Sequence, residues 1–213
     1  MVRTPRPTAV TTDPLAALLE ELDPARIAAV APADEVEMAR AARESLRSGA
    51  LAVLRADSPR HLTVSCLLVA GPSHDPAIAL GLHVKSGQWR QLGGHVDPGD
   101  ASLRNAAVRE LREESSIEVD AIATASSGAA GADSVRLSAG PLAVREFPVG
   151  TAQCEAHVDI LFAARAPHRV ALQTTDAGIS RVDWFSPSAL PQGTAADLRR
   201  DLPSLLRRLG ALP

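Results

Sequence analysis

The chain has 213 residues, of which 46% are hydrophobic and 22% are charged, and this composition is typical of one globular domain with an extension. The formal net charge of −3 argues against a nucleic-acid or anionic-membrane partner. No apolar run reaches transmembrane length, the first residues lack the apolar core of a signal peptide, and Cys66 and Cys154 show no metal-binding or redox spacing. We therefore expect a cytoplasmic protein with free thiols.

The first quarter of the chain predicts short helices. Residues 1–12 are rich in Arg, Pro and Thr and are expected to form a disordered arm. The pairs Asp13-Pro14 and Asp23-Pro24 each place proline after an N-cap residue, which predicts two helix starts. A third helix is predicted from Ala33 to Ser48, ending at Gly49. We expect this segment to pack on the main domain, and a dimer contact or a cap over the active-site cleft are the alternatives.

The main domain is predicted to span residues 58–213, after the arm and helical extension of residues 1–57. Runs of aliphatic and β-branched residues, bounded by Gly and Pro, predict its strands. The segment Lys85–Leu92 is expected to be a short link into a turn at Gly93-Gly94. Strands are predicted at His61–Ala70, Ile78–Val84, Ile117–Ala123, Leu142–Val149, Ala156–Ala164 and Val182–Phe185, loops at Ser126–Asp133 and Thr174–Arg181, a short helix at Ser186–Pro191 and a final amphipathic helix at Ala195–Leu209.

A helix predicted at about Ala101–Ser115 carries the most specific chemistry. It follows a Pro-Gly turn, and Asp100 is expected to cap it. Its residues Glu110, Glu113 and Glu114 are spaced so that they share one helical face. Three like charges at close range raise one another's pKa, and carboxylate oxygens suit hard cations such as Mg²⁺ or Mn²⁺. The pattern therefore indicates a metal site.

The stretch Gly93–Ile117 resembles the signature of the Nudix hydrolases, Gly-x5-Glu-x7-Arg-Glu-U-x-Glu-Glu-x-Gly-U, where U is a bulky aliphatic residue. Three departures are visible: Asp100 stands for the first glutamate, eight residues instead of seven separate it from Arg109, and Ser116 replaces the closing glycine. Ser116 predicts a different exit from the helix, because glycine is preferred where φ is positive. The match to the signature consists of Gly94, Arg109, Glu110, Leu111, Glu113, Glu114 and Ile117.

The resemblance implies an α/β (α+β) fold, namely a Nudix-like α/β/α sandwich with a mixed central sheet. It also implies a hydrolase that uses Mg²⁺ or Mn²⁺ while water attacks phosphorus in the diphosphate linkage of a nucleotide-type substrate. A non-catalytic sensor of nucleotides or phosphometabolites on the same fold is the alternative. A diphosphate isomerase on the same fold would need a catalytic cysteine, for which Cys66 is the candidate, and extra histidine ligands. The expected partner is a small-molecule diphosphate, with neither nucleic acid nor membrane, and a homodimer is open because dimers are frequent in the family.

The resemblance further assigns roles to single residues. Glu110 and Glu114 are the first choice of metal ligands, and Glu113 is expected to bind the metal or to position a metal-bound water. The carbonyl of Gly94 should be a further ligand, and Arg109 should orient a glutamate through an ion pair. These three glutamates and Arg109 are thus the predicted catalytic residues.

The remaining candidates lie outside the signature or beside it. Asp176 is a further candidate for metal ligand or general base, and Glu155 is a weaker candidate for general base. Lys85, Arg90 and His95 are candidates for substrate contact, with a surface or structural role as the alternative. No zinc-binding spacing links the six histidines of the chain.

Overall fold

The structure is a computed structural model that describes residues 14–120, 135–151 and 153–211. The predicted arm at residues 1–12, the predicted loop at Ser126–Asp133 and the end of the predicted strand Ile117–Ala123 lie outside these residues. The helices are α1 (Pro14–Glu21), α2 (Pro24–Ile27), α3 (Ala33–Ser48), α4 (Leu103–Ser115) and α5 (Ala196–Ala211). The strands are β1 (Arg60–Ala70), β2 (Ala77–His83), β3 (Trp89–Arg90), β4 (Leu92–His95), β5 (Val119–Asp120), β6 (Val135–Leu137), β7 (Ala143–Pro148), β8 (Ala156–Ala166) and β9 (Ile179–Phe185). No described helix is both long and apolar enough to cross a bilayer.

The strands form one mixed sheet around the long pair β1 and β8. These two strands run parallel along their whole length, from Arg60 opposite Ala156 to Ala70 opposite Ala166. β2 and β4 pair antiparallel with β1, and β6 and β7 pair antiparallel with β8. β3 and β9 extend the sheet from β2, and β5 extends it from β6. Strands that follow each other along the chain thus pair antiparallel in two places, β1 with β2 and β7 with β8.

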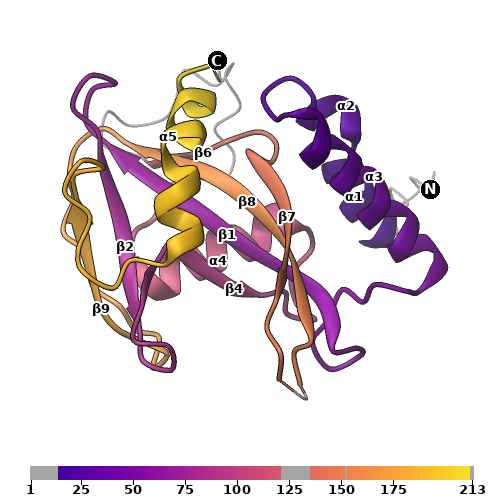
Figure 1. The fold of residues 1–213 in the computed structure, drawn as a ribbon. Coiled ribbons are helices and arrows are strands. Elements are labelled where there is room, and N and C mark those ends of the chain that lie inside the picture. Colours follow the sequence, from indigo (N-terminus) through magenta and orange to yellow (C-terminus); the bar gives the residue numbers. More distant parts are fainter. Residues whose placement is uncertain (1–13, 121–134, 152, 212–213) are drawn as a thin grey trace, which may run out of the picture.

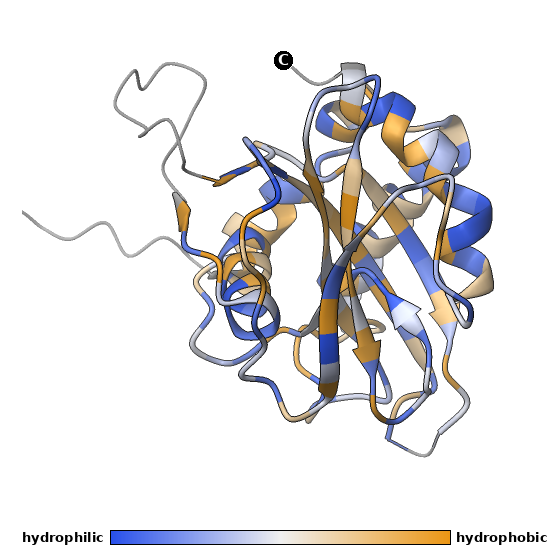
Figure 2. Cartoon of the chain, turned by 90° about the vertical axis from the view of Figure 1, so that its left-hand side faces the viewer, coloured by the Kyte–Doolittle hydropathy of each residue, from blue (hydrophilic) through white to orange (hydrophobic). Residues whose placement is uncertain are grey.

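Helices cover both faces of this sheet, with α5 in front of it and α4 behind it in Figure 1. Successive residues of a strand point to opposite faces, so β1 contributes to two cores. Leu62 and Val64 belong to the core that includes Leu111 of α4, whereas Leu67 belongs to the core that includes Leu202 of α5. Figure 2 shows hydrophobic residues along the strands between the helices. The arrangement is the predicted α/β/α sandwich with a mixed sheet.

The N-terminal helices pack on the α4 side of the sheet, where Leu18 and Leu22 join the same core as α4. The carboxylate of Glu21 accepts hydrogen bonds from the amides of Leu103 at 2.7 Å and Arg104 at 3.1 Å. The first amides of a helix have no acceptor within the helix, so Glu21 supplies one for α4. Burial raises the pKa of Glu21. The extension thus packs on the main domain and supports the helix that carries the glutamates.

Local signals located the first helices accurately. Helix α3 has the predicted bounds, and Gly49 ends it with a φ of 76°. Asp23 caps α2 as predicted, because its carboxylate accepts from the amide of Ala25 at 3.1 Å. In both cases the signal lies within a few residues of the helix end that it determines.

Several elements differ from the prediction, among them strand β3, which lies in the segment expected to be a short link. The segment Ser186–Pro191 forms turns and not a helix, because a single bond from the amide of Ala189 to the Ser186 carbonyl closes one turn and Pro191 has no amide hydrogen to continue it. Strand β6 was not predicted, since three residues are too few for a periodic pattern. Strand β9 begins at Ile179, inside the predicted loop, where it pairs with β2.

Candidate active site

The predicted glycine turn is in fact strand β4. Gly93 and Gly94 lie opposite Ser65 and Val64 of β1. A Cβ atom on Gly93 would lie 2.3 Å from the carbonyl oxygen of Val64, and one on Gly94 would lie 2.6 Å from Oε1 of Glu110. The glycines are required because backbone and carboxylate approach so closely. This approach places the β4 backbone directly against the acidic face of α4.

Arg109 ties helix α4 to the segment before it. Its guanidinium donates to both carboxylate oxygens of Asp100, at 3.2 and 2.9 Å, to Oε1 of Glu110 at 2.8 Å and to the carbonyl of His95 at 2.8 Å. The hydrogen bond to Asp100 is the main cause that raises the pKa of Arg109. Asp100 therefore does not cap the helix as predicted; the hydroxyl of Ser102 accepts from the Asn105 amide instead.

Three carboxylates meet beside Gly94. Glu110, Glu114 and Asp176 each offer an oxygen, and these oxygens lie within 4.8 Å of one another. Glu110 and Glu114 are buried, and the amide of Gly93 donates to Glu114 at 2.7 Å. The pKa of Glu110 is raised to about 7 and that of Glu114 to about 8, mainly by burial, and the neighbouring carboxylates act in the same direction. A divalent cation would offset this repulsion.

The loop before β9 delivers Asp176 to the helix. The last carbonyls of a helix lack partners within it, and this loop supplies two donors. The amide of Gln173 donates to the Ser115 carbonyl at 3.1 Å, and that of Thr175 donates to the Glu113 carbonyl at 2.8 Å. These bonds fix the residue next to Thr175, which is Asp176, over the acidic face of α4.

Helix α4 ends in the conformation that glycine favours, although the residue there is serine. Ser116 has a φ of 54° and a ψ of 24°, in the left-handed region, and its amide donates to the Arg112 carbonyl. The expectation of a different helix exit is therefore wrong. The bonds from the loop before β9 hold the end of the helix in place, which compensates for the strain of a side chain at this position.

Other predicted residues lie farther from this group. Glu113 is exposed and lies 3.3 Å from Nη1 of Arg109, outside the group formed by the other three acids. Lys85 is exposed in the turn between β2 and β3. Arg90 lies 3.6 Å from the carboxylate of Asp197 in α5. Their predicted roles stay predictions.

The structure also adds residues that no sequence pattern selected. Among the described residues, Nε2 of His83 and Oε1 of Gln91 are buried without a hydrogen-bond partner. Burial lowers the pKa of His83, and the charge of Arg90 lowers it further, while that of Asp176 raises it. The charges of Arg90 and Asp176 therefore act on His83, and its Nε2 is left without a hydrogen-bond partner.

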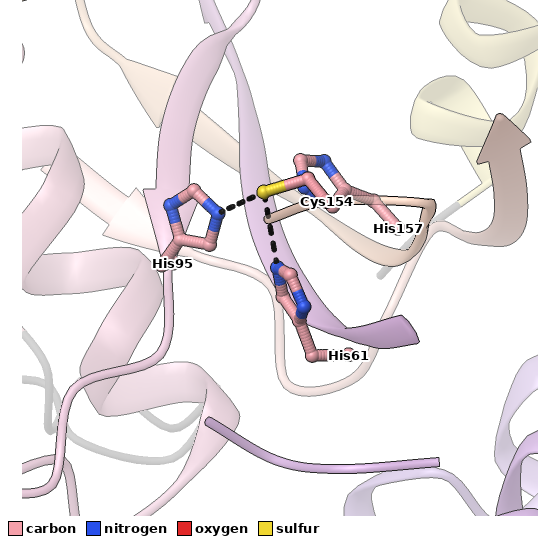
Figure 3. A group of neighbouring side chains, drawn as sticks. All are labelled: His61, His95, Cys154 and His157. Carbon is pink, nitrogen blue, oxygen red and sulfur yellow. Dashed lines mark hydrogen bonds between the residues drawn. The ribbon is translucent and has the colours of Figure 1, made fainter. Parts of the chain in front are cut away.

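A second missed group gathers His61, His95, His157 and Cys154 (Figure 3). The ring of His95, a predicted substrate contact, lies in this group and is 5.1 Å from the rings of both His61 and His157. Burial lowers the pKa of His95 and of His157 to about 4. Spacing along the chain gave no clear signal because His61 and His95 come from separate segments, and only Cys154 and His157 lie close together in sequence. Cys66 and Cys154 are free, as predicted, and both are buried; Glu155, beside Cys154, is exposed.

Comparison with known proteins identifies the fold. The family model of the NUDIX domain matches residues 47–209, whereas no curated protein matches the chain. The NUDIX domain of Shewanella oneidensis NrtR complexed with ADP ribose is 20% identical, with a TM-score of 0.52 over 70% of this chain and 86% of that one. A NUDIX family hydrolase from Clostridium perfringens is 19% identical, with a TM-score of 0.53 over 70% of this chain and 98% of that one. The C. elegans Ap4A hydrolase is 16% identical, with a TM-score of 0.51 over 70% and 95%.

These structures share the fold of this chain, and the family model covers most of its length. Membership supports the enzyme class predicted from the sequence, a Nudix-type pyrophosphohydrolase. The resemblance noted at Gly93–Ile117 is confirmed, together with the Nudix-like fold. The chain belongs to the NUDIX domain family.

Proposed function

We propose that the protein is a metal-dependent hydrolase that cleaves the diphosphate linkage of a nucleotide-type substrate by attack of water on phosphorus. The observation that carries this proposal is the convergence of Glu110, Glu114 and Asp176 beside the backbone of Gly94. Family membership supports a hydrolase, and the acids supply the site that such a reaction needs.

The donor set fits a hard divalent cation. Three carboxylates with oxygens within 4.8 Å, two of them buried and with a raised pKa, form a group that is more stable with a cation than without one. Glu110, Glu114, Asp176 and the carbonyl of Gly94 would hold Mg²⁺ or Mn²⁺. When bound, the ion supplies charge neutralisation of the phosphate oxygens and activation of water.

The side chains around this group orient it. Arg109 bonds to Glu110 and to the His95 carbonyl at the same time, so it holds α4 and β4 at a fixed separation. The amide of Gly93 fixes the carboxylate of Glu114. Glu113 stands exposed beside Arg109, where it is available to orient or deprotonate the attacking water.

Substrates are suggested by the proteins with which the chain shares its fold. Those proteins include an Ap4A hydrolase, a dihydroneopterin triphosphate pyrophosphohydrolase and a domain complexed with ADP ribose. Each of these ligands contains linked phosphates. We propose a nucleoside diphosphate linked to a second group, with Lys85 and Arg90 as candidate phosphate contacts and His83 as a candidate contact of the second group.

A substrate panel tests the proposal. Nucleoside triphosphates, nucleotide sugars, dinucleotide polyphosphates and coenzymes are incubated with the full-length protein and Mg²⁺ or Mn²⁺, and products are separated by chromatography. Reaction in ¹⁸O-labelled water identifies the phosphorus that water attacks. Cleavage by the wild type and by Glu118→Gln, an exposed acid just after α4, but not by Glu114→Gln, is the expected result.

The sensor alternative predicts a different outcome of the same panel. A sensor would bind one compound, detected by calorimetry, without turning it over in the presence of either metal. The ADP-ribose complex of the NrtR domain makes ADP-ribose the first compound to compare in both assays. Binding without cleavage across the panel would overturn the hydrolase proposal.

A further inference from the structure

The group of three histidines and one cysteine is a second set of metal-ligating side chains. His61, His95, His157 and Cys154 each offer one ligand atom, and these atoms lie within 4.8 Å of one another. Figure 3 shows the Cys154 thiol directed between the rings of His61 and His95, with His157 beside them. Two members are buried and two are half-buried, so the group is largely withdrawn from water.

The pairing of three strands brings the rings together. His61 in β1 stands opposite His157 in β8. His95 in β4 stands opposite Thr63, which is two residues along β1 and therefore on the same face as His61. The preceding residue of β4, Gly94, faces Glu110 of α4. The histidine group and the acid group thus lie on opposite faces of one strand.

Cys154 reaches the rings from the turn between β7 and β8. Its amide donates to the carbonyl of Thr151 at 3.1 Å and to the hydroxyl of Thr151 at 3.0 Å, which fixes the turn. The Sγ atom then lies 3.9 Å from Nε2 of His61 and 3.9 Å from Nε2 of His95.

The surroundings of two ring nitrogens, those of His157 and His61, indicate that this group can take up a further ligand. Nε2 of His157 is buried and has no hydrogen-bond partner within the described part of the chain, which is unfavourable for a polar atom. Nδ1 of His61 lies 2.7 Å from the carbonyl of Ser58, to which only a protonated nitrogen can donate. The lone pair of His61 is then on Nε2, which faces the thiol. A backbone acceptor behind the ring is a common support of metal-binding histidines.

We propose that His61, His95, His157 and Cys154 form a structural zinc site. Zn²⁺ prefers four tetrahedral nitrogen and sulfur ligands at about 2.0 and 2.3 Å, which sets sulfur and nitrogen atoms roughly 3.5 Å apart. The two sulfur–nitrogen distances of 3.9 Å need only small rotations to reach this geometry. Four protein ligands leave no open position for water, so the zinc is structural.

The zinc would join the start of β1, the end of β4 and the β7–β8 turn, which the sheet already holds side by side. Its nitrogen and sulfur donors differ from the oxygen donors beside Gly94, which suit Mg²⁺ or Mn²⁺. The two groups are therefore expected to select different metals. The zinc proposal stands independently of the proposed reaction, because it concerns other side chains on the other face.

Metal content and cobalt spectra of the full-length, tag-free protein test the proposal. Protein stripped with a chelator and then exposed to Zn²⁺ and dialysed should retain about one zinc per chain by elemental analysis. Co²⁺ in place of zinc should give a thiolate charge-transfer band in the near ultraviolet. The group beside Gly94 contains no sulfur, so this band distinguishes metal bound to a thiolate from metal bound to the acid group.

Matched variants separate this site from other metal binding. Cys154→Ala should lose the cobalt band and weaken zinc affinity by roughly a hundredfold or more, whereas Cys66→Ala, which removes the other buried thiol, should keep both. Glu114→Gln should also keep both. If Cys154→Ala is insoluble, His157→Asn provides the same comparison of zinc affinity.

These measurements distinguish a zinc site at the histidine group from its absence. Zinc retention that Cys154→Ala or His157→Asn removes, and that Cys66→Ala leaves intact, supports the site. A wild-type protein that retains no zinc, or zinc retention unaffected by both ligand variants, overturns it. A thermal unfolding midpoint that zinc raises in the wild type but not in the ligand variants would show that the metal acts on the fold.

Discussion

The substitution Glu114→Gln should move stability and activity in opposite directions. Glu114 is buried, and its carboxylate accepts from the amide of Gly93 at 2.7 Å. The amide oxygen of glutamine can accept the same hydrogen bond. The variant thus keeps the shape and the main contact of the side chain while it removes the carboxylate that Mg²⁺ would bind.

The size of the stability change follows from the pKa of Glu114. The unfolded carboxyl, with a pKa of 4.5, is ionised at pH 7, whereas burial raises the pKa in the folded protein to about 8 and keeps it largely protonated. Folding at pH 7, which is roughly 2.5 pH units above the unfolded pKa, must therefore protonate this carboxyl. At about 1.4 kcal/mol per unit, this lowers the free energy of unfolding by about 3 kcal/mol. Glutamine relieves this loss, so the metal-free variant should unfold about 5–10 °C above the wild type.

Thermal unfolding with and without Mg²⁺ checks this reasoning together with the turnover assay. Mg²⁺ should raise the unfolding midpoint of the wild type and of Glu118→Gln but not that of Glu114→Gln, and Glu114→Gln should turn over at least about a hundredfold more slowly. Circular dichroism establishes that the variant is folded. A metal-free Glu114→Gln protein that is less stable than the wild type, or that Mg²⁺ stabilises equally, would refute the assignment of Glu114.

Three further predictions use the same contacts. The folded Glu114 binds a proton that its unfolded form has lost, so the stability of the metal-free wild type relative to Glu114→Gln should fall between pH 4.5 and about 8. Urea denaturation of both proteins measures this difference in stability, and the opposing contributions of His95 and His157 cancel in it. A difference that does not change with pH would contradict the prediction. Ser116→Gly should raise the free energy of unfolding by about 0.5 kcal/mol, since it removes a side chain from the left-handed region at the expense of a more flexible unfolded chain, and a loss of stability in urea would argue against strain there. Arg109→Lys should lower kcat by about tenfold or more without unfolding the protein, because one ammonium nitrogen with three donors cannot replace the four hydrogen bonds that the guanidinium makes to Asp100, Glu110 and the His95 carbonyl; unchanged kcat would show that this network is dispensable.

The parts of the fold that sequence reasoning predicted are those with local causes. Helix α3 begins and ends where its capping residues indicate, because Gly49 supplies the left-handed conformation within the last turn. The acidic face of α4 follows from the spacing of Glu110 and Glu114, since helical periodicity alone places them together. Such features need no knowledge of the rest of the chain.

The parts that it did not predict depend on contacts between distant segments. Gly93 and Gly94 have the composition of a turn, but they pair with β1 as part of a strand. Glycine is required there because the β1 backbone and the Glu110 carboxylate exclude any Cβ atom. Ser116 takes the left-handed conformation because bonds from the loop before β9 hold the end of the helix. No pattern within a few residues of either position carries this information.

The same reason explains why histidine spacing gave no zinc signal. His61 and His157 are far apart in sequence, because the chain forms β2 to β7 and α4 between β1 and β8. They stand opposite each other because β1 and β8 pair as parallel strands. A spacing rule detects ligands that share a hairpin or one helical turn, whereas this group is assembled by a sheet. The register of β1, β4 and β8 brings His61, His95 and His157 together, and Cys154 joins them from the turn before β8.

That register also couples the two groups of candidate ligands. Alternation along β4 sends Gly94 toward Glu110 and the ring of His95 toward Cys154, and the carbonyl of His95 accepts from Arg109 at 2.8 Å. His95 therefore contacts the histidine group through its ring and the acid group through its backbone carbonyl. Since sub-ångström placement of ligands affects metal sites and catalysis, a metal bound on the histidine face would set the position of the strand that the acid face uses.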